Sequence, residues 1–284
     1  MSSPLIIVTR GSPLALQQAK DAAQHLEKSL QVKTEIKILT TTGDRQAAWS
    51  LEKQGGKGLF TAELEQALQR GEADVAIHSA KDLPTEMPAG LTIASCLPRR
   101  DPRDVLVRQT QIQSPQKIAT GSPRRRAQGA HIFPHATWTE LRGNVDTRLK
   151  KIVQGEAEAT YLAAAGLSRL GIEKWDGLVF EPVDIIKMVP AAGQGAVAIQ
   201  CRLTDAARYQ TVGCASTSFS VAIERLFLSK LGEGCHTAFA CHHHADKIYL
   251  FRADFGYRAY PFVVSDLTMA SSQADLILSQ LLNR

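Results

Sequence analysis

The most informative single residue of the chain is Asp82, which follows an expected strand over 74–77 and stands beside Lys81. A carboxylate at the end of a strand, kept ionised by a neighbouring cation, can accept hydrogen bonds from a ring N–H and stabilise cationic intermediates. The plainer interpretation is an aspartate that only caps the turn before Leu83 and Pro84. From this pattern alone, both interpretations stay open.

A second group of candidates consists of arginines at expected strand ends and helix starts, where side chains point into a cleft. Its members are Arg10, Arg124, Arg125, Arg142, Arg148 and Arg169. A guanidinium binds a carboxylate through two parallel hydrogen bonds and keeps its charge at any physiological pH. These residue types therefore suit an anionic ligand.

The positive charge is concentrated in residues 99–151, which hold 12 Lys and Arg against 4 Asp and Glu. This segment has a net charge of +8, whereas the whole chain has +5. Such a segment indicates a nucleic acid, a polyphosphate or a small polycarboxylate as partner, unless it is only a solvated face. Its aromatic residues are Phe133 and Trp138 alone, and it contains no groove-reading motif, which disfavours nucleic acid.

Cys235 is the candidate nucleophile or attachment point. It ends a Gly-Glu-Gly-Cys stretch, where glycine allows another molecule to approach closely. A loop thiol in a basic cleft can react or anchor a group, whereas an ordinary cysteine is a small buried hydrophobic residue. The nearby His236, Cys241 and 242–244 match no standard zinc spacing, so we predict no metal site.

Two Gly-Ser-Pro turns are expected to position these side chains. Gly11-Ser12-Pro13 follows a strand predicted over 5–9, and Gly121-Ser122-Pro123 follows one over 117–120. Serine caps a helix, proline suits its first position, and the exposed N–H groups can hold an anion. The recurrence predicts two related α/β lobes with a ligand in the cleft between them.

The remaining pattern predicts how the lobes are connected. Further expected segments are a strand over 34–40, a helix over 59–70 that ends at Gly71, crossovers over 97–102 and 183–190, and a helix over 219–231. Strands alternating with helices predict parallel sheets with ligands at the carboxyl ends of the strands. After Gly213 a short, strand-rich segment indicates a third, smaller domain.

The composition is that of a folded protein. The chain has 284 residues, of which 44% are apolar and 21% charged, and no apolar run approaches the length of a membrane span. The short apolar run near the start is too brief for a signal peptide. Five widely spread cysteines disfavour a disulfide framework, so we expect a reduced, cytoplasmic protein that does not bind membranes.

Seven stretches, in order over about residues 5–235, resemble the porphobilinogen deaminase (hydroxymethylbilane synthase) family. They are TRGSPLAL at 9–16, GKGLF at 56–60, HSAKDLP at 78–84, the pair Arg124-Arg125, LRGNVDTRL at 141–149, AGLSRLG at 165–171 and GQGA at 193–196. A single stretch of this kind would be a weak signal, but the ordered set is specific.

The resemblance implies an α/β fold of two lobes like type II periplasmic binding proteins around a cleft, plus a small α+β C-terminal domain. By this resemblance, residues 1–97 with 191–212 form domain 1, 98–190 form domain 2 and 213–284 form domain 3. It also implies a dipyrromethane cofactor, held by a thioether to a loop cysteine that is Cys235 by position. Four porphobilinogen molecules would be joined head to tail, each losing ammonia, before water releases 1-hydroxymethylbilane for tetrapyrrole biosynthesis.

The resemblance also assigns roles by position. Asp82 is the expected catalytic carboxylate. The expected cofactor-binding residues are Lys81, Ser122, Arg124, Arg125 and Arg148, together with Cys235. The expected substrate-binding residues are Arg10, Ser12, Arg142, Arg169 and Gln194. A monomer that binds porphobilinogen, without nucleic acid, is the expected form.

The sequence also allows two functions other than that of an active enzyme of this family. Around the cysteine, Glu233, His236 and Thr237 depart from the family pattern, which motivates a weakly active or inactive paralogue. The two-lobe cleft by itself also suits a binding protein for a small polycarboxylate. The role of His242, His243 and His244 is not indicated by the sequence.

Overall fold

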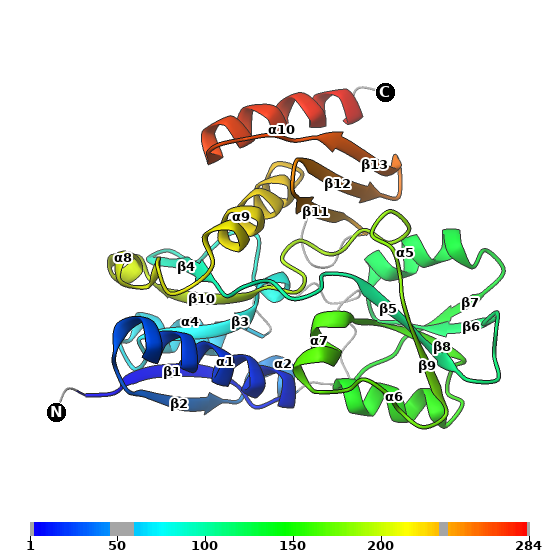
Figure 1. Cartoon of the computed structure of the whole chain (residues 1–284), viewed down its shortest axis with the longest axis horizontal. Coiled ribbons are helices and arrows are strands. Elements are labelled where there is room, and N and C mark those ends of the chain that lie inside the picture. Colours follow the sequence, from blue (N-terminus) through cyan, green and yellow to red (C-terminus); the bar gives the residue numbers. More distant parts are fainter. Residues whose placement is uncertain (1–2, 46–59, 233–237, 283–284) are drawn as a thin grey trace.

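The computed structural model describes residues 3–45, 60–232 and 238–282. Figure 1 shows two sheet-and-helix lobes side by side, with a small C-terminal unit above them. This confirms the expected α/β fold of two lobes and a small α+β unit, while the exact domain boundaries stay a prediction. No helix within these ranges is long and apolar enough to cross a lipid bilayer.

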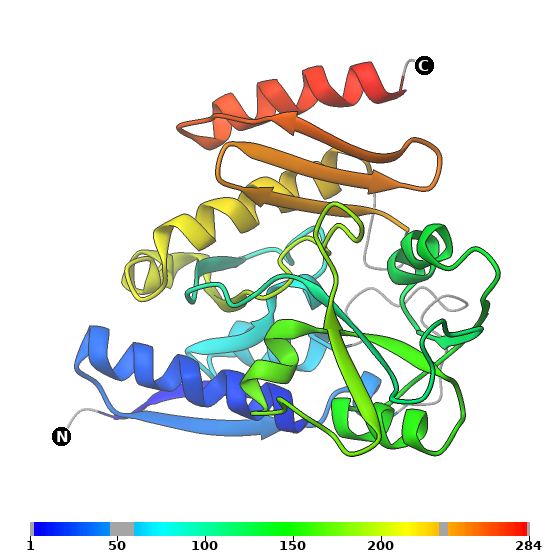
Figure 2. The same ribbon diagram turned by 45° about the vertical axis from the view of Figure 1, so that its right-hand side comes forward.

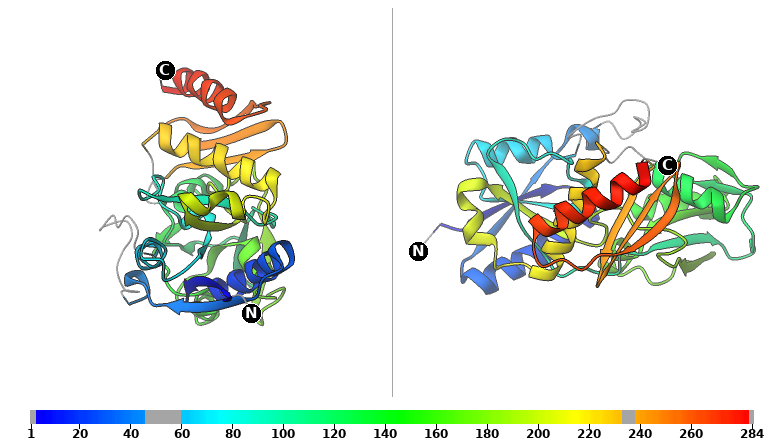
Figure 3. Two further views of the ribbon diagram at one scale, coloured as in Figure 1. Left: turned by 90° about the vertical axis from the view of Figure 1, so that its left-hand side faces the viewer. Right: turned by 90° about the horizontal axis from the view of Figure 1, so that it is seen from above.

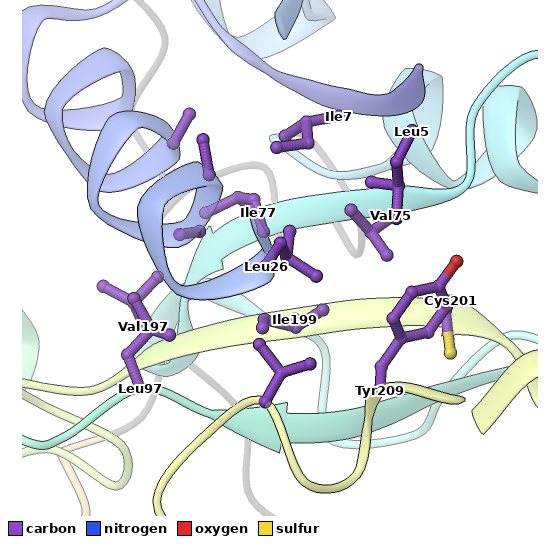
Figure 4. Close-up of a cluster of buried hydrophobic side chains, with 14 residues drawn as sticks. Leu5, Ile7, Leu26, Val75, Ile77, Leu97, Val197, Ile199, Cys201 and Tyr209 are labelled. Atoms are coloured by element: carbon purple, nitrogen blue, oxygen red, sulfur yellow. The ribbon is translucent and has the colours of Figure 1, made fainter. Parts of the chain in front are cut away.

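The first lobe is built on a five-stranded sheet. Its strands, in spatial order, are β2 (Thr34–Leu39), β1 (Leu5–Arg10), β3 (Val75–Ser79), β10 (Val197–Arg202) and β4 (Leu91–Cys96). Its helices are α1 (Pro13–Leu30), α2 (Thr42–Arg45), α4 (Ala62–Gln69) and α8 (Ala206–Tyr209), with a short 3-10 turn η2 (Leu203–Asp205) before α8. Helices α1 and α8 pack on one face through Leu26 and Tyr209, shown in Figure 4, and α4 packs on the other through Leu64.

The second lobe repeats this design. Its sheet has the order β7 (Thr137–Thr139), β6 (Lys117–Ala119), β8 (Ala159–Ala163), β5 (Asp104–Gln109) and β9 (Leu178–Pro182). Its helices are α5 (Pro123–Ile132), α6 (Val145–Val153) and α7 (Ala164–Arg169). Alternate residues of β5 face opposite cores: Val105 and Val107 pack with α6 and α7, and Leu106 packs with Tyr161 on the α5 side.

Both sheets are mixed, so the prediction of parallel sheets was wrong. In each lobe three strands are parallel, and two more are antiparallel to their neighbours. The first antiparallel strand, β10 or β5, is the one that enters after a crossover from the other lobe. The hydrophobic pattern predicts that a strand is present, but it does not indicate whether that strand runs parallel or antiparallel to its neighbours.

The two Gly-Ser-Pro turns start helices in the same way. Ser12 caps α1 by accepting a hydrogen bond from the Ala15 N–H (3.3 Å), and Ser122 caps α5 by accepting one from the Arg125 N–H (3.4 Å). In both helices proline is the first residue. The predicted relation between the lobes is confirmed by these caps and by the shared strand order.

The C-terminal unit consists of a three-stranded antiparallel sheet and two helices. Its elements are α9 (Ala215–Lys230), β11 (Ala240–His244), β12 (Lys247–Arg252), β13 (Gly256–Pro261) and α10 (Leu267–Leu282). Figure 3 shows α10 lying over this sheet, and one core cluster joins both helices to it. Helix α9 begins before the predicted residue 219, and α10 was not foreseen within the strand-rich segment.

Two crossovers connect the lobes, the outgoing one over residues 97–103 and the return one over 183–196 (Figure 2), and they contact each other. The Arg100 N–H donates to the Gly195 carbonyl (3.2 Å). Gly195 has φ +89°, and an added Cβ would lie 2.5 Å from the Arg100 oxygen. Gly193, with φ +74°, similarly lies against Ala80, which an added Cβ would approach to 2.9 Å. Glycine is needed at both positions for the crossovers to pack this closely.

Candidate active site

Two adjoining pockets lie at the carboxyl end of β3, and they share Leu14, Gln18 and Ser79 in their walls. The first is lined at its polar side by Arg10, Ser12 and Asp82. The second is lined by Lys81 and Arg169, with the glycines of the return crossover beside them. The expected position of a ligand site at the end of a strand therefore coincides with two pockets that carry cations.

Asp82 is exposed at the wall of the first pocket. It ends a short 3-10 turn, η1 (Ala80–Asp82), directly after β3. The turn is anchored because the Ala80 N–H donates to the Ala196 carbonyl (3.0 Å) and Gly193 packs against Ala80. The backbone therefore holds this carboxylate at a fixed place, while its oxygens stay accessible to a ligand.

Lys81 points to the other side of the turn, toward the second lobe. Its Nζ donates to Gln194 Oε1 (3.4 Å). Burial, together with the cations of Arg125 and Arg124, lowers the pKa of the Lys81 ammonium to about 8, although Asp82 and Asp104 act in the opposite direction. The ammonium of Lys81 is thus easier to deprotonate than that of an exposed lysine.

We expect the affinity for a carboxylate ligand to fall as the pH rises through about 8. The bound carboxylate favours protonated Lys81, so above pH 8 the dissociation constant should rise by up to about tenfold per pH unit. The Lys81→Arg variant should show no such inflection, because guanidinium stays charged. Measuring the constant between pH 7 and 9.5 checks this, and equal slopes in both proteins would contradict it.

Arg124 and Arg125 enclose a carboxylate that the sequence analysis missed. Asp104, which is fully buried, accepts hydrogen bonds from Arg124 Nη1 (2.7 Å) and from Arg125 Nε (2.9 Å). Burial opposes ionisation, but the two guanidinium groups hold the pKa of Asp104 well below its usual range. Asp104 fixes both arginines at the start of α5, and its place before the apolar run of β5 was the only signal in the sequence.

Arg142 and Arg148 add two partly buried cations near the same helix start. Arg148 Nε donates to the Gly143 carbonyl (2.8 Å), and Arg142 pairs with Glu140. Burial and the nearby Arg125 and Arg142 lower the pKa of Arg148 to about 10. Among the charged neighbours of Arg148 the two arginines outweigh Asp82, so this part of the site carries an excess of positive charge.

Arg10 and Ser12 lie on the wall of the first pocket. The guanidinium of Arg10 lies over the ring of Phe60, 4.2 Å from its centroid, which orients it by a cation–π contact. Ser12 is engaged as the cap of α1. Sequence reasoning gave Phe60 no role, although it lies in the GKGLF stretch, of which residues 56–59 are outside the described ranges.

Gln194 and Arg169 are more buried than expected for residues that contact substrate. Gln194 is fully buried and donates to the Pro102 carbonyl (2.7 Å), so it ties the two crossovers together. Arg169 is 8% exposed and donates from Nη2 to the Gly195 carbonyl (2.9 Å). Both still lie next to the pocket cations, Gln194 against Lys81 and Arg169 in the wall of the second pocket.

A second buried carboxylate, Glu224 of α9, links the C-terminal unit to both crossovers. It accepts from Arg99 Nη1 (2.7 Å) and Nη2 (2.9 Å), and from the Gly193 N–H (2.6 Å). His242 Nδ1 lies 3.1 Å from the same carboxylate, and the His243 N–H donates to it (2.8 Å). The histidines therefore have a structural role here, and no metal-binding cluster occurs in the described parts of the chain.

Cys235 lies outside the described residues, as do Glu233, His236 and Thr237. None of the four described cysteines lines either pocket. Cys241 is fully buried in the core of the C-terminal unit, and burial raises its pKa well above the ordinary value. Cys214 is partly exposed, but it lies at the start of α9 and lines neither pocket described above.

Fold and site together define a two-lobe α/β protein whose cleft presents cations from both lobes beside one exposed carboxylate. Residues 5–210 match the family model described as porphobilinogen deaminase, dipyromethane cofactor binding domain. The porphobilinogen deaminase of Roseiflexus sp. is 40% identical over 246 residues, covering 83% of this chain and 80% of that protein. That of Nitratiruptor sp. is 42% identical over 236 residues, covering 81% and 76%. The chain belongs to the porphobilinogen deaminase family.

Among solved structures, the periplasmic VFT2 domain of Bordetella pertussis BvgS is similar with a TM-score of 0.42 and 15% sequence identity. The alignment covers 79% of this chain and 86% of that domain.

Proposed function

We propose that this protein is a hydroxymethylbilane synthase, which joins four porphobilinogen molecules head to tail and releases one ammonia for each. The observation that carries the proposal is Asp82, exposed on a pocket wall with Arg10 on one side and Lys81 on the other. Each porphobilinogen carries two carboxylates and one pyrrole N–H. The cations can bind the substrate carboxylates, and the Asp82 carboxylate can accept a hydrogen bond from the pyrrole N–H.

The charge distribution fits the family's dipyrromethane cofactor, which carries four carboxylates. Burial and neighbouring arginines lower the pKa values of Lys81, Arg125 and Arg148, so an anionic group bound beside these cations would relieve their repulsion. These three cations, Arg124 and the Ser122 turn would hold the group, with Cys235 as its thioether anchor. When bound, it supplies the nucleophilic pyrrole carbon that starts the chain.

The protein's own residues then act on the incoming substrate. The residues that bind the incoming porphobilinogen in this proposal are Arg10, Ser12, Arg142, Arg169 and Gln194. The guanidinium groups orient its carboxylates, which places the aminomethyl carbon against the growing chain. As ammonia leaves, positive charge develops on the pyrrole, and the Asp82 carboxylate stabilises it through the ring N–H.

The mass of the purified protein separates this proposal from its two alternatives. An enzyme of this kind should exceed its sequence mass by a two-pyrrole adduct and convert porphobilinogen to the linear tetrapyrrole. A polycarboxylate-binding protein should show neither property. A protein that stays unmodified and inactive after incubation with porphobilinogen would rule out the proposed activity, and an adduct with negligible turnover would identify an impaired paralogue.

We expect Cys235→Ser to abolish the adduct, because the thioether needs the thiol. Cys214→Ser is the matched control. Hydrogen bonds from Ser216 and Thr217 lower the pKa of the Cys214 thiol to about 7, so Cys214 is the most reactive described thiol and would be the competing anchor. Intact-mass spectrometry should show the adduct on the Cys214 variant only. An adduct that persists in Cys235→Ser would place the anchor elsewhere.

We further propose that the protein acts as a cytoplasmic monomer and binds no nucleic acid. In the second lobe the side chains of Arg124, Arg125 and Arg169 are buried, so they do not form the exposed stripe that a nucleic-acid backbone requires. Sedimentation of the purified protein, with and without a DNA duplex, tests the monomeric state and the lack of nucleic-acid binding.

A further inference from the structure

The carboxylate of Asp21, on α1 of the first lobe, pairs with arginines from two other chain segments. Asp21 Oδ2 lies 3.2 Å from Arg100 Nη2 on the outgoing crossover and 3.8 Å from Arg169 Nε on α7 of the second lobe. Arg169 Nη2 in turn donates to Gly195 on the return crossover, and Arg100 Nη1 donates to Ser168 of α7 (3.3 Å). Asp21 is therefore the one acidic side chain paired with Arg169 in the described parts of the chain.

Arg169 is a buried cation whose hydrogen-bonding capacity is largely unused. Its side chain is only 4% exposed, and its Nε has no hydrogen-bond partner among the described residues, because Asp21 lies beyond hydrogen-bond length. Burial and the nearby Arg100 lower the pKa of Arg169 to about 10. A buried guanidinium in this condition favours a closer carboxylate.

The space for such a carboxylate adjoins Arg169. The second pocket is lined by Arg169 and by Lys81, the other cation of this wall. Asp21 does not line this pocket, and its second oxygen is held by Gln17 Nε2 (2.8 Å) one helical turn away. Asp21 is thus held outside the pocket, at a distance from which it attracts the Arg169 guanidinium without accepting a hydrogen bond from its Nε.

We propose that Asp21 is a positioning residue that acts as a resident carboxylate for Arg169 and weakens its hold on the carboxylates of a ligand in the second pocket. This rests on the proposed function only in naming porphobilinogen as that ligand. Asp21 keeps the guanidinium at the contact between α1 and α7 and offsets part of its charge. A ligand carboxylate in the pocket competes with Asp21 for the Arg169 guanidinium. The affinity of the site for the ligand therefore depends on how much more strongly the ligand attracts this guanidinium than Asp21 does.

The test is the Asp21→Asn variant, which keeps the shape and removes the charge. We expect KM for porphobilinogen to fall about three- to fivefold, with kcat changed less than twofold, as befits the loss of one partly exposed competing charge. Asp21→Glu, which retains the charge, should keep the KM of the unchanged protein. Asp275→Asn, which removes an exposed carboxylate paired with Lys230 on the C-terminal unit, should leave both constants unchanged.

Calorimetric titration with a pyrrole dicarboxylate that lacks the aminomethyl group tests the same point without turnover. The dissociation constant should fall by the same factor in Asp21→Asn. If the unchanged protein binds this probe but does not convert porphobilinogen, the proposed function fails while the role of Asp21 is still decided by the titration. An unchanged or higher dissociation constant in Asp21→Asn, with a lower melting temperature, would show that Asp21 only fastens the lobes and would overturn the proposal.

Discussion

Replacing Asp82 by asparagine is expected to leave a folded protein that hardly turns over. The side chain is exposed at the pocket wall, so its loss removes no core packing. Asparagine can still accept a hydrogen bond from a pyrrole N–H, but it carries no charge to stabilise the cation that forms as ammonia leaves. Removing one such electrostatic contribution typically costs about 10²–10³-fold in kcat, and we expect a loss in that range.

The steady-state rate of tetrapyrrole release measures this effect, and thermal unfolding provides the check on folding. Asp254→Asn is the matched control, since Asp254 is another exposed carboxylate, paired with Arg252 on the C-terminal unit away from the pockets. We expect the Asp82 variant to keep its melting temperature and to change kcat far more than KM. A variant with near-normal turnover would show that the carboxylate serves only to cap the turn.

The parts of the site that local sequence determines were predictable. The two Gly-Ser-Pro turns predicted both caps, because a cap needs only neighbouring residues. Asp82 and Lys81 were placed at the end of β3 for the same reason, since a short apolar run and the polar residues after it specify the local geometry.

The long-range pairs could not be predicted in this way. Arg99 and Glu224 are separated by 125 residues, and neither lies in a local motif that requires the other. Asp104 stood in the sequence as one of four acids in a basic segment, with nothing to indicate that it would be fully buried between two arginines. Tertiary packing decides such pairings, because a buried charge must find its partner wherever the fold brings one.

These two buried carboxylates also explain how a basic cleft is compatible with a stable fold. Asp104 neutralises arginines that would otherwise repel one another at the start of α5. Glu224 anchors the crossover that carries Gly193, which in turn packs against the turn that presents Asp82. The C-terminal unit is therefore connected to the position of the candidate catalytic carboxylate through one buried side chain.

Glu224→Gln is accordingly expected to be the most destabilising single substitution among those considered. Breaking a buried ion pair by removing one partner costs about 3–5 kcal/mol, and Arg99 would remain as a poorly compensated buried charge. Arg99 and His242 hold the pKa of Glu224 at about 2, although burial alone would raise it. The stabilisation is therefore complete above pH 4.5 and is lost as the pH falls toward 2, so this acid-side decline should be weaker in the variant.

Urea unfolding at several pH values measures both effects, and the double variant Glu224→Leu/Arg99→Met separates charge from packing. Because the double variant leaves neither charge behind, it should lose less stability than the sum of the two single changes. The turnover of Glu224→Gln below its unfolding midpoint gives a further readout. Glutamine keeps only one accepting oxygen, for which the N–H groups of Gly193 and His243 compete, so the turn that carries Asp82 is held less firmly. We expect kcat to fall more than KM rises. A variant as stable as the unchanged protein would mean that Arg99 finds another partner and that Glu224 does not join the C-terminal unit to the cleft.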